Sequence, residues 1–228
     1  MKALLYKEFK LAMHPICYVF IAAFPIMILI PGYPMAVGFI YVLSCYPILF
    51  LGANKGQQSN DLLYSTLLPV RKKDTVLARI ITVIIMQLAF IAILSALAPL
   101  AAFFQKSMIE SGADPQEIEN IGISLNGYVS MLAIVIIGYA IADLIFFPIY
   151  YKNGKSIVMS TLFTILGFVV YLGVFTIGLP LGLEPVKAFL EGPIGIQFAL
   201  LGGAVAISFI LHFAVYKISA KRLEQVDF

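Results

Sequence analysis

Six long apolar runs constrain the fold of this chain more than any other feature. They cover Ile16–Ile30, Met35–Gly52, Ile80–Phe104, Tyr128–Tyr150, Ile157–Leu183 and Ile194–Tyr216. A helix of about 20 apolar residues crosses the ~30 Å hydrocarbon core of a bilayer. Charged residues make up only 12% of the chain, against about 25% in a soluble domain. We therefore predict an all-α, polytopic membrane protein with six transmembrane helices in one domain, residues 1–228.

The first two runs leave their topology open. Ile16–Ile30 is short, and a tight turn at 31–34 joins it to Met35–Gly52. The pair forms either two full crossings or a shallow hairpin, and in both cases its ends stay on one side. Proline removes a backbone donor and clashes with the preceding turn, so kinked or broken helices are expected where it occurs. The prolines within the first five runs are Pro25, Pro47, Pro99, Pro148 and Pro180.

The distribution of Lys and Arg predicts the orientation, because basic loops stay on the cytoplasmic side of a membrane. With both termini inside, 13 of the 15 basic residues fall in inner segments, and only Lys106 and Lys187 fall outside. Six of the 12 acidic residues are also outside, mostly in the predicted extracellular loop 105–127. This loop either attracts cationic substrates by its field or is a solvated segment from which topology excludes basic residues.

Residues 1–15 are predicted to form an interfacial elbow helix. At 100° per residue, Lys7, Lys10 and His14 share one arc, and Glu8 falls among the apolar positions. Such a helix lies in the headgroup layer with its lysines towards anionic membrane lipids. No second histidine lies near His14, so we expect no metal site.

The longest cytoplasmic segment, 53–79, is predicted to form short coupling helices. Asp61 suits the positive end of a helix dipole, leucines follow it, and Pro69 ends that helix. A basic run follows, and Asp74 begins a second helix. Leucines exposed on a cytoplasmic loop are expected to be buried against another surface, which is either the membrane or a partner protein. The basic run alone fits ordinary anchoring at the inner surface, whereas the run beside a leucine helix favours a docking site.

Several classes of site are not expected. The net charge of +3 suggests no nucleic-acid partner, and Cys17 and Cys45 lie in apolar stretches as free thiols. Gly154–Ser156 ends like a phosphate-binding loop, but Ile149 occupies the position of its first glycine. We therefore predict no catalytic residue and no bound cofactor. An intramembrane serine protease would need a histidine beside its serine, and both histidines lie towards the inner interface.

Three segments carry a family resemblance. The segment Asn60–Asp74, with its acidic start, leucines, Leu-Pro-Val and basic run, resembles the signature loop of small, six-span ABC-transporter permeases of the type-2 class. Pro148–Lys155 resembles the Pro-Leu-Tyr-Tyr-Lys-x-Gly ending of that family's fourth span, and Met1–Lys10 resembles its elbow helix. Within that class, the chain resembles the permeases of phenol-soluble-modulin exporters and similar Gram-positive export systems.

The resemblance implies partners and a site. Two permeases, identical or different, would form the path in a bacterial cytoplasmic membrane, and separate ABC ATPase subunits would bind ATP and Mg. The exported substrate would be hydrophobic or amphipathic, with cytolytic or antimicrobial peptides as one class. The residues expected to contact the ATPase are Asp61, Leu62, Leu63, Tyr64, Leu67, Leu68, Pro69, Arg71, Lys72, Lys73, Lys152 and Lys155.

Asp143 departs from that family pattern and is a predicted substrate-path residue. A charged Asp near the middle of a span costs about 2.5–3.5 kcal/mol on insertion scales. It either faces an inward-open cavity and contacts a cationic substrate, or hydrogen-bonds within a packed helix contact. As a third alternative, it reaches interfacial water or pairs with an inner-loop lysine such as Lys152 or Lys155. Alternative functions are lipid or drug and toxin extrusion, self-immunity, and substrate binding in a vitamin importer, which would need a polar pocket near the outer side.

Overall fold

The computed structural model describes residues 2–13, 15–30, 70–112, 127–153, 157–178 and 183–225. All elements in these ranges are helical, so the all-α prediction is confirmed for them. The α-helices are α1 (Lys2–Lys7), α2 (Ile16–Ala23), α5 (Lys72–Glu110), α7 (Tyr128–Asn153), α8 (Ile157–Leu172), α10 (Glu184–Leu190) and α11 (Ile194–Glu224). Two π-helices, η1 (Glu8–Ala12) and η4 (Gly173–Gly178), follow α1 and α8, and the 3-10 helix η2 (Phe24–Leu29) follows α2.

Four helices in the described ranges are long and apolar enough to cross a membrane. They are Lys72–Glu110, Tyr128–Lys152, Ile157–Phe175 and Ile194–Glu224, which correspond to the last four predicted spans. The first predicted span is the shorter apolar helix Ile16–Leu29. At 1.5 Å per residue in α2 and 2.0 Å in η2, it is about 24 Å long, less than the ~30 Å hydrocarbon core. Met35–Gly52 lies outside the described residues.

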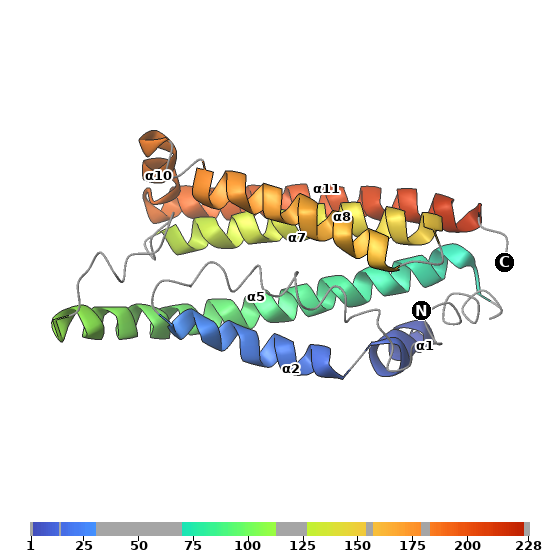
Figure 1. Ribbon diagram of the computed structural model, residues 1–228, viewed down its shortest axis with the longest axis horizontal. Helices are drawn as coiled ribbons and strands as arrows, with labels where there is room; N and C mark the ends of the chain where they lie inside the picture. Colours follow the sequence, from blue (N-terminus) through green and yellow to red (C-terminus); the bar gives the residue numbers. More distant parts are fainter. Residues whose placement is uncertain are drawn as a thin grey trace.

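The helices form two layers, seen edge-on in Figure 1. One layer contains α7, which packs against both α8 and α11; the other contains α5, which packs against α2 and η2. The two layers meet mainly where α11 packs on α5. The short α1 lies across the end of the bundle and packs against α5 (Figure 1). The described ends of the chain therefore lie at the same end of the molecule.

Glycines allow α7 and α8 to approach closely. A Cβ atom built on Gly138 would lie 2.9 Å from the Tyr171 ring, and one built on Gly167 would lie 2.5 Å from Cδ1 of Ile145. The Tyr171 hydroxyl also donates to the carbonyl of Ile134 at 2.9 Å. In lipid, helices associate through such close packing and interhelical hydrogen bonds, because the surrounding acyl chains are as apolar as the side chains. These contacts therefore stabilise the α7–α8 pair.

The helix boundaries differ from the predicted spans in a regular way. α5 begins two residues before Asp74 and runs to Glu110, beyond the predicted end at Phe104 and into the predicted loop 105–127. α11 likewise continues past Tyr216 to Glu224. Hydropathy marks only the part of a helix that lies in hydrocarbon, so polar extensions escape it. Pro99 and Pro148 lie inside α5 and α7, which continue past them, so these helices are not broken there.

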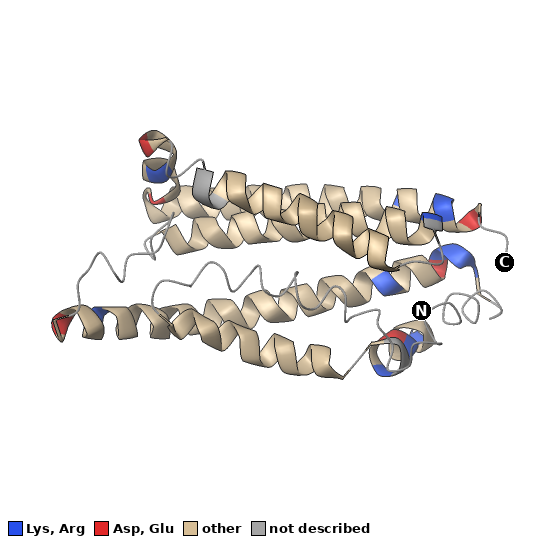
Figure 2. Ribbon diagram, in the orientation of Figure 1, with Lys and Arg blue, Asp and Glu red and all other residues tan. Residues whose placement is uncertain are grey.

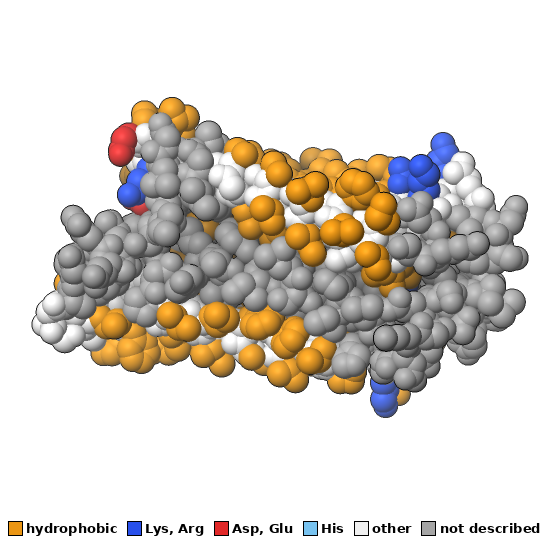
Figure 3. Space-filling model, viewed as in Figure 1, with side chains coloured by type: hydrophobic (Ala, Val, Ile, Leu, Met, Phe, Trp, Pro, Cys, Tyr) orange, Lys and Arg blue, Asp and Glu red, His pale blue; other side chains and the backbone are white. Residues whose placement is uncertain are grey.

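Charged residues lie at the two ends of the bundle. Figure 2 shows most of the described Lys and Arg residues near the described chain ends, and acidic residues predominating at the opposite end. Between the ends, the visible described surface is largely hydrophobic (Figure 3). On α8 and α11 many large apolar side chains are exposed, among them Phe163 at 51% and Phe209 at 78%. This pattern is expected of helices that face lipid.

The structure corrects the predicted orientation of the N-terminal helix. The lysine arc should have faced the headgroups, yet Lys7 is only 9% exposed and Glu8 only 3%. Leu4, Lys7 and Glu8 form one buried face of the helix, which packs on α5, while Lys10 is exposed and donates to the Tyr6 hydroxyl at 2.8 Å. The reason is Glu8: its carboxylate is buried against α5 and turns the neighbouring Lys7 inwards.

Candidate intramembrane site

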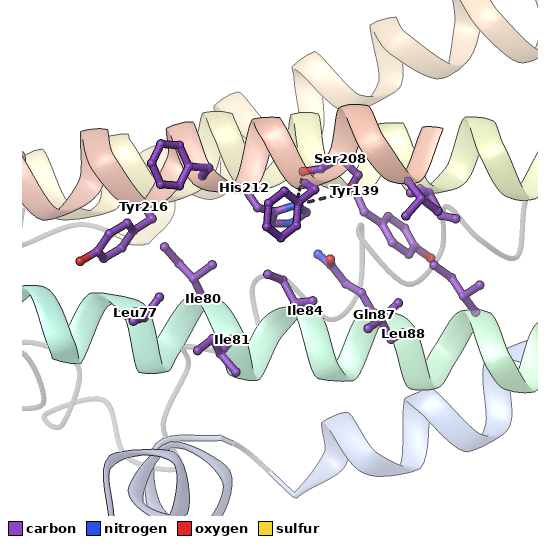
Figure 4. Close-up of a pocket in the computed structure, with 15 residues that line it drawn as sticks. Leu77, Ile80, Ile81, Ile84, Gln87, Leu88, Tyr139, Ser208, His212 and Tyr216 are labelled. Atoms are coloured by element: carbon purple, nitrogen blue, oxygen red, sulfur yellow. Dashed lines mark hydrogen bonds between the residues drawn. The ribbon is translucent and has the colours of Figure 1, made fainter. Parts of the chain in front are cut away.

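A pocket of about 380 Å³ lies between α5, α7 and α11 (Figure 4). Its size is that of a small-molecule site. Most of its lining is aliphatic or aromatic, and the polar side chains among the lining residues are Gln87, Tyr139, Ser208, His212 and Tyr216. On α5 the lining runs from Leu77 to Ile91, about 21 Å along the helix axis. The pocket therefore occupies the half of the bundle nearer the basic end.

Helical periodicity explains why these side chains converge. On α11 the lining residues Val205, Ser208, Phe209, His212, Phe213 and Tyr216 recur every three or four positions, so they share one face. On α7 the lining residues are Ile136 and Tyr139, and Asp143 is the next position on that face. Asp143 does not line the pocket itself. It is fully buried behind the polar side chains.

Asp143 is the centre of a three-helix hydrogen-bond cluster. The Gln87 amide nitrogen of α5 donates to Oδ2 of Asp143 at 3.0 Å, and Nε2 of His212 on α11 lies 2.9 Å from the same oxygen. Gln87 is 4% exposed, and the His212 side chain is 12% exposed. Among the described residues, Oδ1 of Asp143 has no hydrogen-bond partner. The cluster thus has an unused acceptor, on a residue whose two partners Gln87 and His212 line the pocket.

The geometry of His212 fixes one proton in the cluster. Nδ1 of His212 lies 2.7 Å from the carbonyl oxygen of Ser208. A carbonyl only accepts, so Nδ1 carries a hydrogen and donates it. The 2.9 Å contact between Nε2 and Asp143 then also needs a hydrogen, because two facing lone pairs would repel. Whether this proton belongs to the imidazole or to the carboxyl, the pair has no net charge.

The cluster explains how a carboxyl group is accommodated inside the membrane. A net-neutral, hydrogen-bonded pair avoids most of the cost of an isolated charge in hydrocarbon. The structure therefore places Asp143 in a packed helix contact, one of the three predicted arrangements. Its partners Gln87 and His212 were not predicted from the sequence. Their depth in the membrane was a usable signal, because polar residues at similar depths on different spans can meet. Gln87 and Asp143 each lie seven residues, about 10 Å, from the inner end of their predicted spans. His212 lies four residues, about 6 Å, from the inner end of its span.

A second buried cluster lies nearer the basic end. Arg79 of α5 forms a bidentate ion pair with Glu8, with Nε to Oε2 at 2.7 Å and Nη2 to Oε1 at 3.2 Å. Its Nη1 donates to the Tyr150 hydroxyl of α7 at 3.1 Å. Arg79 and Glu8 are each 3% exposed. This cluster connects the N-terminal helix, α5 and the end of α7. Glu8 among apolar positions was the sequence signal for it.

The structure describes four of the predicted ATPase-contact residues. Arg71 precedes α5 and pairs with Asp74 at 3.0 Å, Lys72 and Lys73 begin that helix, and Lys152 is exposed in the last turn of α7. Both helix ends lie at the basic end of the bundle (Figure 2). The remaining predicted contacts lie outside the described residues: Asp61, Leu62, Leu63, Tyr64, Leu67, Leu68, Pro69 and Lys155.

Cys17 is buried in the contact between α2 and α5 as a free thiol, as predicted, and Cys45 lies outside the described residues. Together, the long apolar helices and the intramembrane pocket define a multi-pass α-helical membrane protein.

Residues 3–224 match the model of the family described as ABC-2 family transporter protein. The chain therefore belongs to the ABC-2 transporter family, whose members are the membrane components of ABC transporters and act with ABC ATPase subunits. No curated protein and no solved structure matches the chain.

Proposed function

We propose that this chain is the permease subunit of an ATP-driven ABC exporter in a bacterial cytoplasmic membrane. Two permease copies, identical or different, and two ATPase subunits would make up the transporter, with both permease termini in the cytoplasm. The substrate is hydrophobic or amphipathic, and cationic membrane-active peptides are one fitting class. The observation that carries this proposal is the family match over residues 3–224. The apolar pocket at the buried Asp143 cluster supports the choice of substrate.

The ATPase is expected to act on the basic end of the bundle. Leu62–Arg71 and the turn 152–156 are the proposed contacts, and they lead into α5 and out of α7. Pressure on these segments would move two helices that line the pocket. In this scheme ATP and Mg act only in the partner subunit, and this chain converts the partner's closure into a helix movement.

Leu63→Asp tests the ATPase contact. A charge placed in a buried apolar contact costs several kcal/mol, because it is desolvated without a partner. We expect the variant to insert normally but to lose its ATPase subunit during purification, and with it substrate-stimulated ATP hydrolysis. Phe189→Asp is the matched control: Phe189 is 50% exposed on α10, at the opposite end of the bundle. If the Leu63 variant retains its ATPase subunit, the proposed contact is wrong.

Self-immunity without transport is the competing function within this family. Reconstituted vesicles distinguish the two, because an exporter moves a fluorescent amphipathic peptide across the bilayer only when ATP is present on the ATPase side. Peptide binding without ATP-dependent movement would favour the immunity function.

A further inference from the structure

The hydrogen-bonding capacity of the Asp143 cluster points to one kind of ligand group. Nε2 of Gln87 donates to Oδ2 of Asp143, Nδ1 of His212 donates to the Ser208 carbonyl, and one proton lies between Nε2 of His212 and Oδ2 of Asp143. Oδ1 of Asp143 is an acceptor without a partner among the described residues. A buried acceptor without a partner costs free energy. The group that completes this cluster is therefore a hydrogen-bond donor.

We propose that the pocket binds a hydrophobic ligand with one cationic, hydrogen-bond-donating group such as an ammonium, and that this ligand binds in exchange for the proton that Asp143 and His212 share. The inference rests on the proposed function, since it names the substrate class of the same site. The exchange balances: one cation enters the pocket, and one proton leaves His212 and Asp143 for water. What remains is a neutral imidazole, a carboxylate and the bound cation.

Charge balance requires the exchange. With the shared proton the pair is neutral, so an added cation would bring an uncompensated charge into a low-dielectric site, where electrostatic energies are large. When the proton leaves, the negative charge of Asp143 offsets the cation. Among the described residues that line the pocket there is no Asp or Glu, so this apolar lining supplies no other compensating charge.

The ligand has a direct route from the bilayer. Leu88, Phe209 and Phe213 line the pocket, yet they are 57%, 78% and 58% exposed. These side chains therefore form a lipid-facing rim between α5 and α11, whereas Gln87 and the His212 side chain are only 4% and 12% exposed. A ligand dissolved in the membrane enters sideways, with its apolar part along the rim and its cationic group towards the polar side chains.

Other titratable groups near the cluster do not replace the shared proton. Tyr139 of α7 and Tyr216 of α11 line the pocket, and each carries a phenol hydroxyl and no carboxyl group. The Lys217 ammonium group of α11 lies over the Phe213 ring, 5.4 Å from its centroid. On α8 the Tyr171 hydroxyl donates to a carbonyl, and on α5 the side chain that faces Asp143 is the uncharged Gln87. The proton between Asp143 and His212 is therefore the exchangeable one.

Linkage gives the measurable consequence. If one proton leaves for each cation bound, each increase of one pH unit lowers the apparent Kd about tenfold, as long as Asp143 and His212 still share their proton. At higher pH, where this proton has already left, the apparent Kd becomes constant. The experiment uses the full chain in lipid nanodiscs without its ATPase. Dansylcadaverine, a fluorescent hydrophobic primary amine, is titrated between about pH 5.5 and 8.5, a range in which an alkylamine of pKa about 10 stays charged. Calorimetry in two buffers of different ionisation enthalpy counts the released protons directly.

Two comparisons make the test specific. Asp143→Asn keeps the size and an acceptor oxygen but removes the carboxylate, so we expect the pH slope to vanish and binding at high pH to weaken at least tenfold. Tyr171→Phe removes a titratable group outside the pocket and should keep the slope. N-acetylated dansylcadaverine, which is uncharged, should bind weakly and without dependence on pH.

A pH-independent Kd for the unmodified chain would overturn the inference, as would absence of amine binding at every pH, equal binding of the acetylated probe, or an unchanged slope in Asp143→Asn. Any of these results leaves the proposed function standing if the chain still binds its ATPase and stimulates it. Loss of the ATPase interaction alongside a tenfold slope would instead refute the proposed function and keep the cation site.

Discussion

Glu8 connects the N-terminal helix to the bundle, and Glu8→Gln should destabilise the protein severely. The substitution preserves the side-chain size and removes the negative charge between Arg79 at 2.7 Å and Lys7 at 3.6 Å. Both partners are buried, with side-chain exposures of 4% for Arg79 and 11% for Lys7. Two neighbouring buried cations would then lose their ion pair with Glu8.

The magnitude follows from this burial. Breaking a buried ion pair by removing one partner costs about 3–5 kcal/mol. For a chain of this size, each kcal/mol lowers Tm by about 2–4 °C, so the expected loss is roughly 6–20 °C. Arg79→Met should cost a similar amount, because it leaves the Glu8 carboxylate buried. The double variant should lose less than the two single variants together, since it leaves neither charge of the pair alone.

Cys17 provides the readout. Its side chain is fully buried in the contact between α2 and α5, so a thiol-reactive dye labels it only when this region opens. Heating the purified chain in a Cys45→Ser background then gives an apparent Tm. Glu110→Gln is the control, because the pair of Lys106 and Glu110 spans 3.8 Å with side chains 78% and 67% exposed. Its loss should cost below about 1 kcal/mol.

A Tm of Glu8→Gln within about 2 °C of that of Glu110→Gln would contradict this prediction, because the buried pair would then contribute no more than a surface pair. Costs of the two single variants that simply add in the double variant would contradict it as well, since partners in one ion pair must couple.

Two further predictions concern packing and topology. Gly138→Ala should destabilise by about 1–3 kcal/mol, because the new methyl group meets two aromatic rings of α8. Gly167→Ala should be close to neutral in the same melting assay, since Ile145 can rotate away and alanine favours the helix by about 1 kcal/mol. Equal losses would refute this account. Single cysteines at Ser65 and Ser111 should react with an impermeant reagent from opposite sides of intact cells, with Ser111 outside; outside labelling at Ser65 would reverse the predicted orientation.

Much of the architecture could be predicted from hydropathy alone. The runs from Ile80 onwards correspond to helices α5, α7, α8 and α11, because about 20 apolar residues have few alternatives in a bilayer. Helix ends were harder to place, since polar turns outside the hydrocarbon carry no hydropathy signal. Thus α11 runs eight residues past its predicted end at Tyr216.

The side-chain clusters could be predicted only in part. Asp143 and Glu8 both stood out, one as a carboxylate within a span and the other as a carboxylate among apolar positions. Their partners Gln87, His212 and Arg79 come from helices far away in the sequence. Which helix faces which is decided by packing between layers, and a periodicity within one helix carries no information about that. The prediction that Lys7 faces the headgroups was wrong for the same reason, because the contact between the N-terminal helix and α5 is not visible in the periodicity of that helix.

The two clusters together connect α5 and α7, which otherwise contact each other sparsely. Nearer the basic end, Arg79 of α5 donates to the Tyr150 hydroxyl of α7. Gln87, eight residues and about 12 Å further along α5, donates to Asp143 of α7. A shift of α5 along or away from α7 must therefore break or re-form both hydrogen bonds. The deeper bond belongs to the polar wall of the pocket, and α5 begins beside the proposed ATPase contact at Arg71. Force applied at the start of α5 thus acts on the hydrogen bonds of Asp143 without any other element having to transmit it.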